Sequence, residues 1–149
     1  MYKHILIPTD GSPTAQKAVE AGIDFARESG ARITFFTAMP EYALPSASEV
    51  MAHKAVISLE DHERLSAEKA HAIQAPSLER ARTCGVAFDA DHALSDKPYE
   101  AIIAAARKHG CDAIYMASHA RGALSRLMHG GSQTFAVLTN SDIPTLVVR

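Results

Sequence analysis

The chain carries its most informative chemistry in a short stretch near the carboxyl end. Two glycines are followed there by two hydroxyl residues and an amide, in the order Gly130, Gly131, Ser132, Gln133 and Thr134. Glycine lets the backbone approach oxygen atoms closely, the free amides at a helix start attract anions, and hydroxyls donate hydrogen bonds. This combination predicts a phosphate site. The residues alone leave one alternative open, which is an ordinary loop with Ser132 as the helix N-cap.

Three segments carry polar or small residues directly after apolar runs. They are residues 8–12, 37–39 and 117–134. In the last of them, His119 and Arg121 add positive charge beside the glycines. The ligand crevice of an open α/β sheet lies beyond the carboxyl ends of its strands, near the point where the strand order reverses. We therefore expect the three segments to meet at one edge of a sheet.

Short apolar runs rich in β-branched and aromatic residues predict the strands of that sheet. There are five such runs, at 3–8, 32–39, 86–94, 113–117 and 145–148. In the third run, Asp89 and Asp91 alternate with apolar residues, which is typical of a strand with one wetter face. We expect that strand at an edge of the sheet.

Helical spacing of apolar residues fills the stretches between the strands. It predicts helices from Pro13 to Gly30, over much of 41–85, from Pro98 to Gly110, and from Ser132 to about Leu138. Within the second of these, Pro76 should kink or interrupt the helix, because proline has no amide hydrogen to donate and its ring clashes with the preceding turn.

The alternation of strands and helices predicts the fold class. Five strands separated by helical regions require crossover connections, so the strands pair in parallel and helices cover both faces. A chain of 149 residues, of which 47% are apolar, can bury one good core. The sequence thus predicts a single α/β domain over residues 1–149, built on a five-stranded, parallel, doubly wound sheet.

Composition argues against several classes of partner. A formal net charge of −2 provides no excess of Lys and Arg, so we expect neither a nucleic acid nor an anionic membrane as partner. No run of about 18 apolar residues is present and Met1 leads directly into a strand-like stretch, so we expect a soluble, cytoplasmic protein. Cys84 and Cys111 stand alone and predict inert, buried thiols. No metal site is expected.

Four segments spread along the chain have a pattern that goes beyond a fold class. They are Ile5–Ser12, Pro98–Ile102, Cys111–His119 and Ile143–Val148. With them the chain resembles the universal stress protein family over essentially its whole length. The resemblance implies a Rossmann-like fold of the adenine nucleotide alpha hydrolase type, a homodimer paired through the last strand, and ATP held without rapid turnover.

The resemblance also implies which residues touch the nucleotide. It places Asp10 and its neighbours near the nucleotide, Ala38 against the adenine, and the phosphates beside the glycine-rich stretch. The full set comprises Pro8, Thr9, Asp10, Ala38, Met39, Ala117, Ser118, His119, Ala120, Arg121, Gly130, Gly131, Ser132, Gln133 and Thr134. Asp10 could contact Mg²⁺ through water, since a triphosphate-bound divalent ion commonly keeps several waters and one carboxylate contact.

The chain departs from the glycine pattern of the family's ATP-binding members. That pattern is a glycine, two residues, a second glycine, nine residues, then glycine with serine or threonine. Here Ala117 and Ala120 stand at the first two glycine positions, and Gly131 with Ser132 comes one residue late. If Gly130 is counted as the third glycine instead, Gly131 stands at the hydroxyl position; we prefer Gly131 with Ser132 and a one-residue insertion. Alanine costs little where φ is negative and on the order of 1 kcal/mol or more where the backbone is left-handed.

Two functions of different class therefore remain open. The first is a sensor or regulator that binds ATP or another adenine nucleotide without efficient catalysis. The second is a family member that has lost nucleotide affinity and acts through dimerisation and protein contacts. No activated nucleophile or water-orienting group is visible, so no catalytic residue is assigned and ATP hydrolysis should be slow at most. A phosphorelay receiver domain needs more acidic residues than Asp10, and a flavin site needs aromatic stackers that the sequence does not offer.

Overall fold

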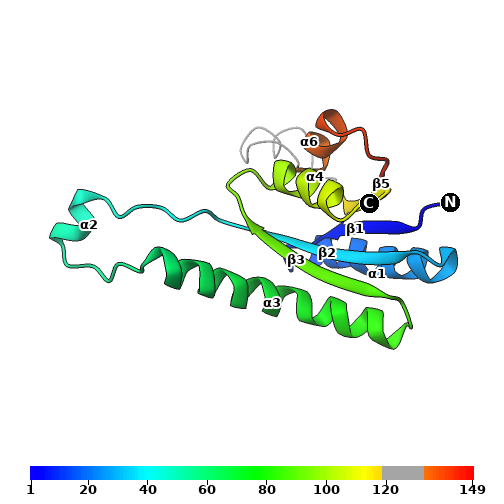
Figure 1. Ribbon diagram of the computed structural model, residues 1–149, viewed down its shortest axis with the longest axis horizontal. Helices are drawn as coiled ribbons and strands as arrows, with labels where there is room; N and C mark the ends of the chain where they lie inside the picture. The colour runs from blue at the N-terminus through cyan, green and yellow to red at the C-terminus, as the bar shows by residue number, and fades with distance from the viewer. Residues whose placement is uncertain (119–132) are drawn as a thin grey trace.

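The computed structural model describes residues 1–118 and 133–149. Its strands follow the order that the sequence predicts (Figure 1). The elements are β1 (His4–Pro8), α1 (Pro13–Ser29), β2 (Arg32–Met39), α2 (Ala47–Met51), α3 (Leu59–Thr83), β3 (Phe88–Leu94), α4 (Pro98–Lys108), β4 (Ala113–Ala117), α6 (Gln133–Asn140) and β5 (Thr145–Val148).

The five strands form one parallel sheet in the order β3-β2-β1-β4-β5. The chain moves outward from β1 to β2 and β3, then crosses back to β4 beside β1 and continues to β5. The strand order thus reverses between β1 and β4, at the middle of the sheet. The predicted fold class is confirmed, and so is the edge position of β3, which pairs with β2 among the described strands.

Helices cover both faces of the sheet because the central strand is apolar on both sides. Ile5 and Ile7 pack with residues of α1 and α3 in one core cluster, whereas Leu6 packs with residues of α4 and α6 in the other. All three side chains are fully buried. Helix α1 lies especially close to β1, since a Cβ on Gly22 would come within 2.5 Å of Ile7 Cδ1.

The region between β2 and β3 differs from its prediction. Helix is absent from residues 52–58, so α2 and α3 are separate, and Ser58 starts α3 by accepting a hydrogen bond from Asp61 N at 3.1 Å. The expected interruption at Pro76 was wrong, because α3 runs through it. Both Pro76 and Ala72 are exposed, so water can solvate the Ala72 carbonyl that proline leaves without an amide donor.

Candidate functional site

The sheet opens at its carboxyl edge between the two central strands. Pairing of β1 with β4 is limited to Ile5 beside Ala113 and Leu6 beside Ile114. Beyond these pairs, β1 continues along β2 as far as Pro8, and β4 continues along β5. The ends of β1 and β4 therefore part where the strand order reverses, which is where open α/β sheets form ligand crevices.

The loop after β1 is held by Thr9. Its amide donates to Phe36 O at 2.8 Å, and its hydroxyl accepts from Gly11 N at 3.2 Å. The next residue, Asp10, is exposed, and its Oδ1 accepts from Ser12 N at 2.9 Å. Gly11 has a φ of 78°, a conformation that favours glycine. The Asp10 carboxylate is thus exposed to solvent, whereas Thr9 beside it is buried and hydrogen-bonded.

A buried chain of hydrogen bonds connects this turn to β2, α3 and β3. Thr37 Oγ1, on β2, donates to Thr9 O at 2.9 Å and accepts from Gln74 Nε2, on α3, at 3.1 Å. The same Gln74 amide nitrogen donates to Asp91 O, on β3, at 2.7 Å. Thr37 and Gln74 are 1% and 2% exposed. The Asp10 turn is therefore connected to the edge strand through two buried polar side chains.

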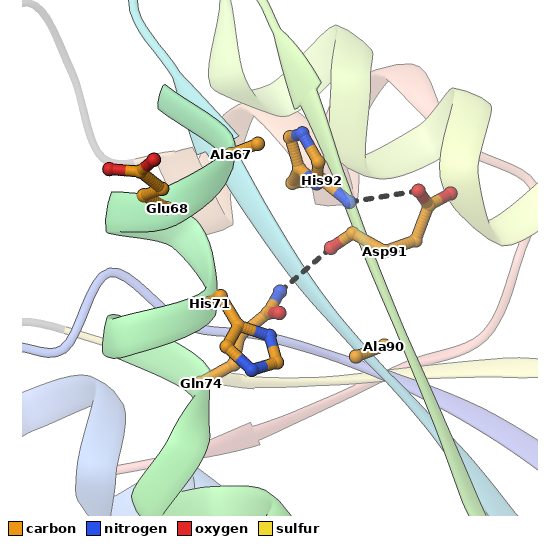
Figure 2. Close-up of a pocket in the computed structure, with 7 residues that line it drawn as sticks. All are labelled: Ala67, Glu68, His71, Gln74, Ala90, Asp91 and His92. Atoms are coloured by element: carbon orange, nitrogen blue, oxygen red, sulfur yellow. Dashed lines mark hydrogen bonds between the residues drawn. The ribbon is translucent and has the colours of Figure 1, made fainter. Parts of the chain in front are cut away.

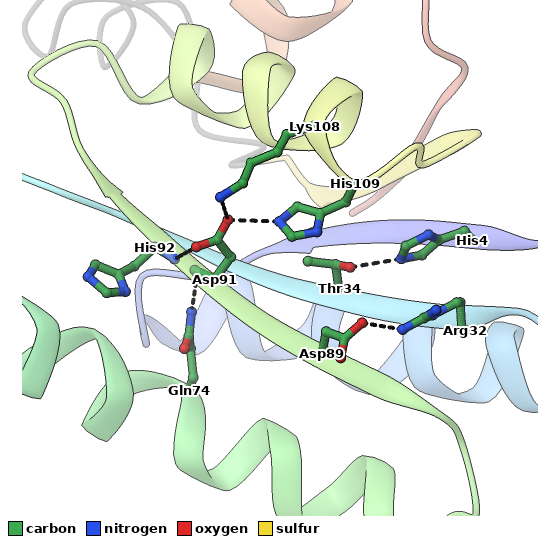
Figure 3. A network of polar contacts seen from close by, with 9 residues as sticks. All are labelled: His4, Arg32, Thr34, Gln74, Asp89, Asp91, His92, Lys108 and His109. Atoms are coloured by element: carbon green, nitrogen blue, oxygen red, sulfur yellow. Dashed lines mark hydrogen bonds and ion pairs between the residues drawn. The ribbon is translucent and has the colours of Figure 1, made fainter.

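The far end of this chain is a charged cluster around Asp91 (Figure 3). The Asp91 carboxylate accepts from Lys108 Nζ at 2.8 Å and from His109 Nε2 at 2.7 Å. Burial raises the pKa of Asp91, but the hydrogen bonds from Lys108, His109 and the His92 amide outweigh burial and bring its pKa below the usual value. The carboxylate stays ionised and ties β3 to the end of α4.

At the carboxyl end of β4, the start of α6 is hydrogen-bonded to its neighbours. Thr134 is buried and its hydroxyl donates to Ala117 O, the last residue of β4, at 2.7 Å. The exposed Gln133 uses its side-chain oxygen to accept from Tyr99 N at 2.9 Å. Because Lys97 gives α4 no side-chain cap, Gln133 serves as that cap. Two side chains predicted to hold phosphate thus carry structural hydrogen bonds.

The other predicted residues lie either near the carboxyl ends of the strands or outside the residues that the structure describes. Ser118 N donates to Val148 O at 2.8 Å and closes the β4–β5 ladder. Ala38 is half-buried against the α4 side of the sheet, and Met39 is 9% exposed. Six predicted residues lie outside the described ranges, and they are His119, Ala120, Arg121, Gly130, Gly131 and Ser132.

The backbone at Ala117 bears on the departure from the family's glycine pattern. Among the described residues other than glycine, His53 has a positive φ and Ala117 does not. Ala117 is the last residue of the extended strand β4. A methyl group on an extended backbone causes no left-handed strain. Alanine at the first glycine position is therefore accommodated without distortion of β4.

A concave feature lies between α3 and β3 (Figure 2). It is an open groove of about 480 Å³, lined by Ala67, Glu68, His71, Gln74, Ala90, Asp91 and His92. None of the residues predicted from the sequence lines it. Gln74 both lines the groove and belongs to the buried chain of hydrogen bonds that reaches Thr9.

Sequence reasoning expected Thr37 at the carboxyl edge of the sheet, within residues 37–39, but did not identify its hydrogen bond to Thr9 O. It did not single out Gln74. A signal was present for Gln74, because it lies at helical spacing from Ala70, Ser77 and Ala81, all of which are buried. A long polar side chain on such a face must find hydrogen-bond partners inside the protein. The position of Thr37 at the end of a strand indicated the edge of the sheet but not its bonding partners, since threonine is common in buried strands.

Within residues 1–118 and 133–149, no cluster of metal-ligating side chains occurs. Nor does any helix in those ranges have the length and apolar character needed to span a bilayer.

Comparison with known proteins identifies the family of this chain. A family model described as the universal stress protein family matches residues 1–149. Universal stress protein MJ0531 of Methanocaldococcus jannaschii is 28% identical over 152 residues, covering 100% of this chain and 83% of the relative. The solved structure of hypothetical protein MJ0577 superposes with a TM-score of 0.74 at 25% identity, over 99% of this chain and 96% of the other. A universal stress protein in complex with cAMP has a TM-score of 0.73 at 22% identity, over 99% and 97%, and so shares the fold. Since the family model spans the whole chain, the protein belongs to the universal stress protein family.

Proposed function

We propose that the protein binds an adenine nucleotide in the crevice between β1 and β4 and acts as a regulator without efficient catalysis. The observation that carries the proposal is the parting of these two strands at the reversal of strand order, where pairing ends after Leu6 and Ile114. Ligands of open α/β sheets bind at that position. ATP, with Mg²⁺ near Asp10, is the ligand we favour, and the protein would act in the cytoplasm.

Similar structures support the class of ligand. Universal stress proteins with this fold are described in complex with cAMP, with dAMP and with AMP. The shared part of these ligands is the adenine nucleoside with its first phosphate. We therefore expect the adenine base to determine which ligand binds. In this proposal Ala38 and Met39 contact the adenine. The sugar and phosphates lie near Thr9, Asp10, Ala117 and Ser118.

A second function rests on a different observation. Gln133 and Thr134, predicted to hold the phosphate tail, already bond to Tyr99 N and Ala117 O. Ala117 also stands where ATP-binding relatives have glycine. If these features lower affinity for a triphosphate, the protein acts through dimerisation and protein contacts in place of nucleotide sensing.

Isothermal titration separates the two functions. ATP with Mg²⁺ should bind saturably to the purified protein, and GTP should bind at least tenfold more weakly because its base presents different hydrogen-bonding groups. No saturable binding at millimolar ATP would favour the second function. Measuring AMP and cAMP under the same conditions tells whether the terminal phosphates add affinity.

Replacement of Asp10 gives a second, more local test. Asp10→Asn removes the exposed carboxylate while keeping an oxygen for Ser12 N, so the fold should be unaffected and the Mg²⁺ dependence of ATP binding should weaken. Asp24→Asn, on the exposed surface of α1, makes the same change of charge away from the crevice and serves as the control. ATP turnover, if measurable, should remain slow in all three proteins.

The homodimer expected through the last strand belongs to the same proposal. Strand β5 pairs with β4 and ends the strand order of the sheet, and Val147 is 38% exposed. An edge strand offers backbone amides and carbonyls to a second copy. Val147→Lys should place charge at that contact and lower the molar mass in solution to that of a smaller assembly.

A further inference from the structure

Residues 40–59, which we call the α2 arm, extend away from the sheet. The chain leaves the carboxyl end of β2, forms the short helix α2 and returns to the start of α3, so that the arm projects beyond the body of the protein (Figure 1). None of these residues is buried. Connections between elements are usually shorter than this, and long ones are commonly functional.

Hydrogen bonds and an aromatic contact stabilise the α2 arm where it joins the rest of the protein and along its length. His62 Nε2 lies 2.9 Å from Pro40 O, and Tyr42 OH donates to Ile57 O at 3.0 Å across the two limbs. The Tyr42 ring meets the His62 ring edge to face, with centroids 5.5 Å apart. At the tip, Ser46 and Glu49 form a capping box that starts α2. These contacts join the two limbs of the arm and start its helix.

The surface of this arm is unusually apolar for a solvated connection. Six large apolar side chains are 45% to 84% exposed, and they are Leu44, Val50, Met51, Val56, Ile57 and Leu59. Exposed apolar side chains scattered singly are ordinary, whereas a group on one projecting element marks an interaction surface. Most of the large apolar side chains that the described residues expose lie on this one arm.

We propose that the α2 arm packs against the α2 arm of a second copy of this chain, related to it by a two-fold axis. A standard interface takes ~800 Å² from each partner. Six large apolar side chains exposed to 45% or more, together with the adjacent exposed first turn of α3, provide an area of that order. A two-fold contact uses the same patch on both copies, so one apolar arm is sufficient to specify it.

Charge at the arm is compatible with a second copy of itself. Lys54, on the returning limb, is exposed, and so are Glu60 and Asp61 in the first turn of α3. Two-fold pairing can place Lys54 of one copy near Glu60 of the other, and reciprocally, while Asp61 keeps its ion pair with Arg64 at 3.2 Å. Opposite charges at the rim of an apolar contact favour the correct register over like-charged alternatives.

The contact is separate from the pairing proposed for β5. The arm leaves the carboxyl end of β2, whereas β5 lies at the other side of the sheet. If both contacts form, the protein assembles into tetramers, and if the arm contact alone forms, it assembles into dimers. In either case, loss of the arm contact halves the molar mass.

Analytical ultracentrifugation at tens of micromolar protein tests the proposal. The double variant Leu44→Ser with Met51→Ser changes the two most exposed apolar residues of the arm, at 84% and 82%, so it should fold normally. We expect its molar mass to be half that of the wild type, with unchanged far-UV circular dichroism and an unchanged response to adenine nucleotides.

A control double variant, Lys17→Ser with Glu20→Ser, alters two exposed residues of α1 and should keep the wild-type mass. An arm variant with the wild-type mass would overturn the proposal, and so would a wild-type protein that is monomeric at these concentrations. The latter result would point to a different protein as the occupant of the arm. Val147→Lys, examined in parallel, reports on β5 pairing independently of the arm.

Discussion

Gln74 offers the sharpest test of how the crevice is supported. Its side-chain amide donates to Thr37 Oγ1 at 3.1 Å and to Asp91 O at 2.7 Å, and Thr37 in turn donates to Thr9 O. The Gln74 side chain is 2% exposed, so water cannot readily replace these bonds. Substitution of Gln74 should therefore destabilise the whole protein and loosen the turn that carries Asp10.

Two substitutions separate hydrogen bonding from packing. Gln74→Met keeps the length of the side chain and removes both hydrogen bonds, each of which contributes about 1 kcal/mol, so the free energy of unfolding should fall by about 2 kcal/mol. Gln74→Ala also leaves a cavity between α3 and the sheet, which should bring the loss to roughly 3 kcal/mol. Lys69→Ala, on the exposed face of the same helix, should change stability by less than about 0.5 kcal/mol.

Urea unfolding followed by far-UV circular dichroism measures these losses, since the chain has no tryptophan. With a slope of about 2 kcal/mol per molar urea, Gln74→Met should lower the midpoint by about 1 M. A Gln74→Met protein as stable as the wild type would refute the reasoning, because the two buried hydrogen bonds would then contribute nothing net. Nucleotide affinity, measured in the absence of urea, should fall in both Gln74 variants and stay unchanged in Lys69→Ala.

Three further predictions concern charge, backbone and thiols. The folded state holds the pKa of Asp91 below its usual value, so its ionised carboxylate should stabilise the fold above pH ~4. That contribution, about 1 kcal/mol at neutral pH, disappears as the pH falls through the lowered pKa, and Asp91→Asn should remove this pH dependence of the urea midpoint. Gly11→Ala should lower the free energy of unfolding by about 1 to 2 kcal/mol, because Gly11 has a φ of 78°, and it should also weaken nucleotide binding. Gly30 has a φ of 70° and open space around it, so Gly30→Ala should lower the free energy of unfolding through backbone strain alone. Burial raises the pKa of Cys111 to about 11, so at pH 8 a thiol reagent should leave Cys111 unmodified in the folded protein and modify it in urea.

Each of these three has an outcome that contradicts it. An Asp91→Asn protein with the wild-type pH profile would show that the carboxylate makes no net contribution. If the Gly11→Ala protein binds nucleotide as tightly as the Gly30→Ala protein, the turn that contains Asp10 does not contribute to nucleotide binding. Rapid modification of Cys111 at pH 8 without denaturant, identified by mass spectrometry, would contradict its burial at 7% exposure.

The elements and their order could be read largely from the sequence because local spacing controls them. The apolar run Ile5–Ile7 is buried on both faces, and such a run in a short segment indicates a strand covered by helices on two sides. Ser12 and Pro13 start α1 as expected. The prediction for Pro76 failed because solvent exposure of the neighbouring turn, which decides whether a freed carbonyl is tolerated, depends on how the helix lies against the sheet.

The amino-acid order alone determined which residues lie at the carboxyl edge, since the ends of parallel strands must share one side of the sheet. Tertiary structure alone decided what those residues do there. It bonded Gln133 to the start of α4 and Thr134 to the end of β4, and it brought Thr37 and Gln74 beneath Thr9 from distant parts of the chain. Hydrogen-bond partners across such separations depend on packing angles and registers that no local pattern contains.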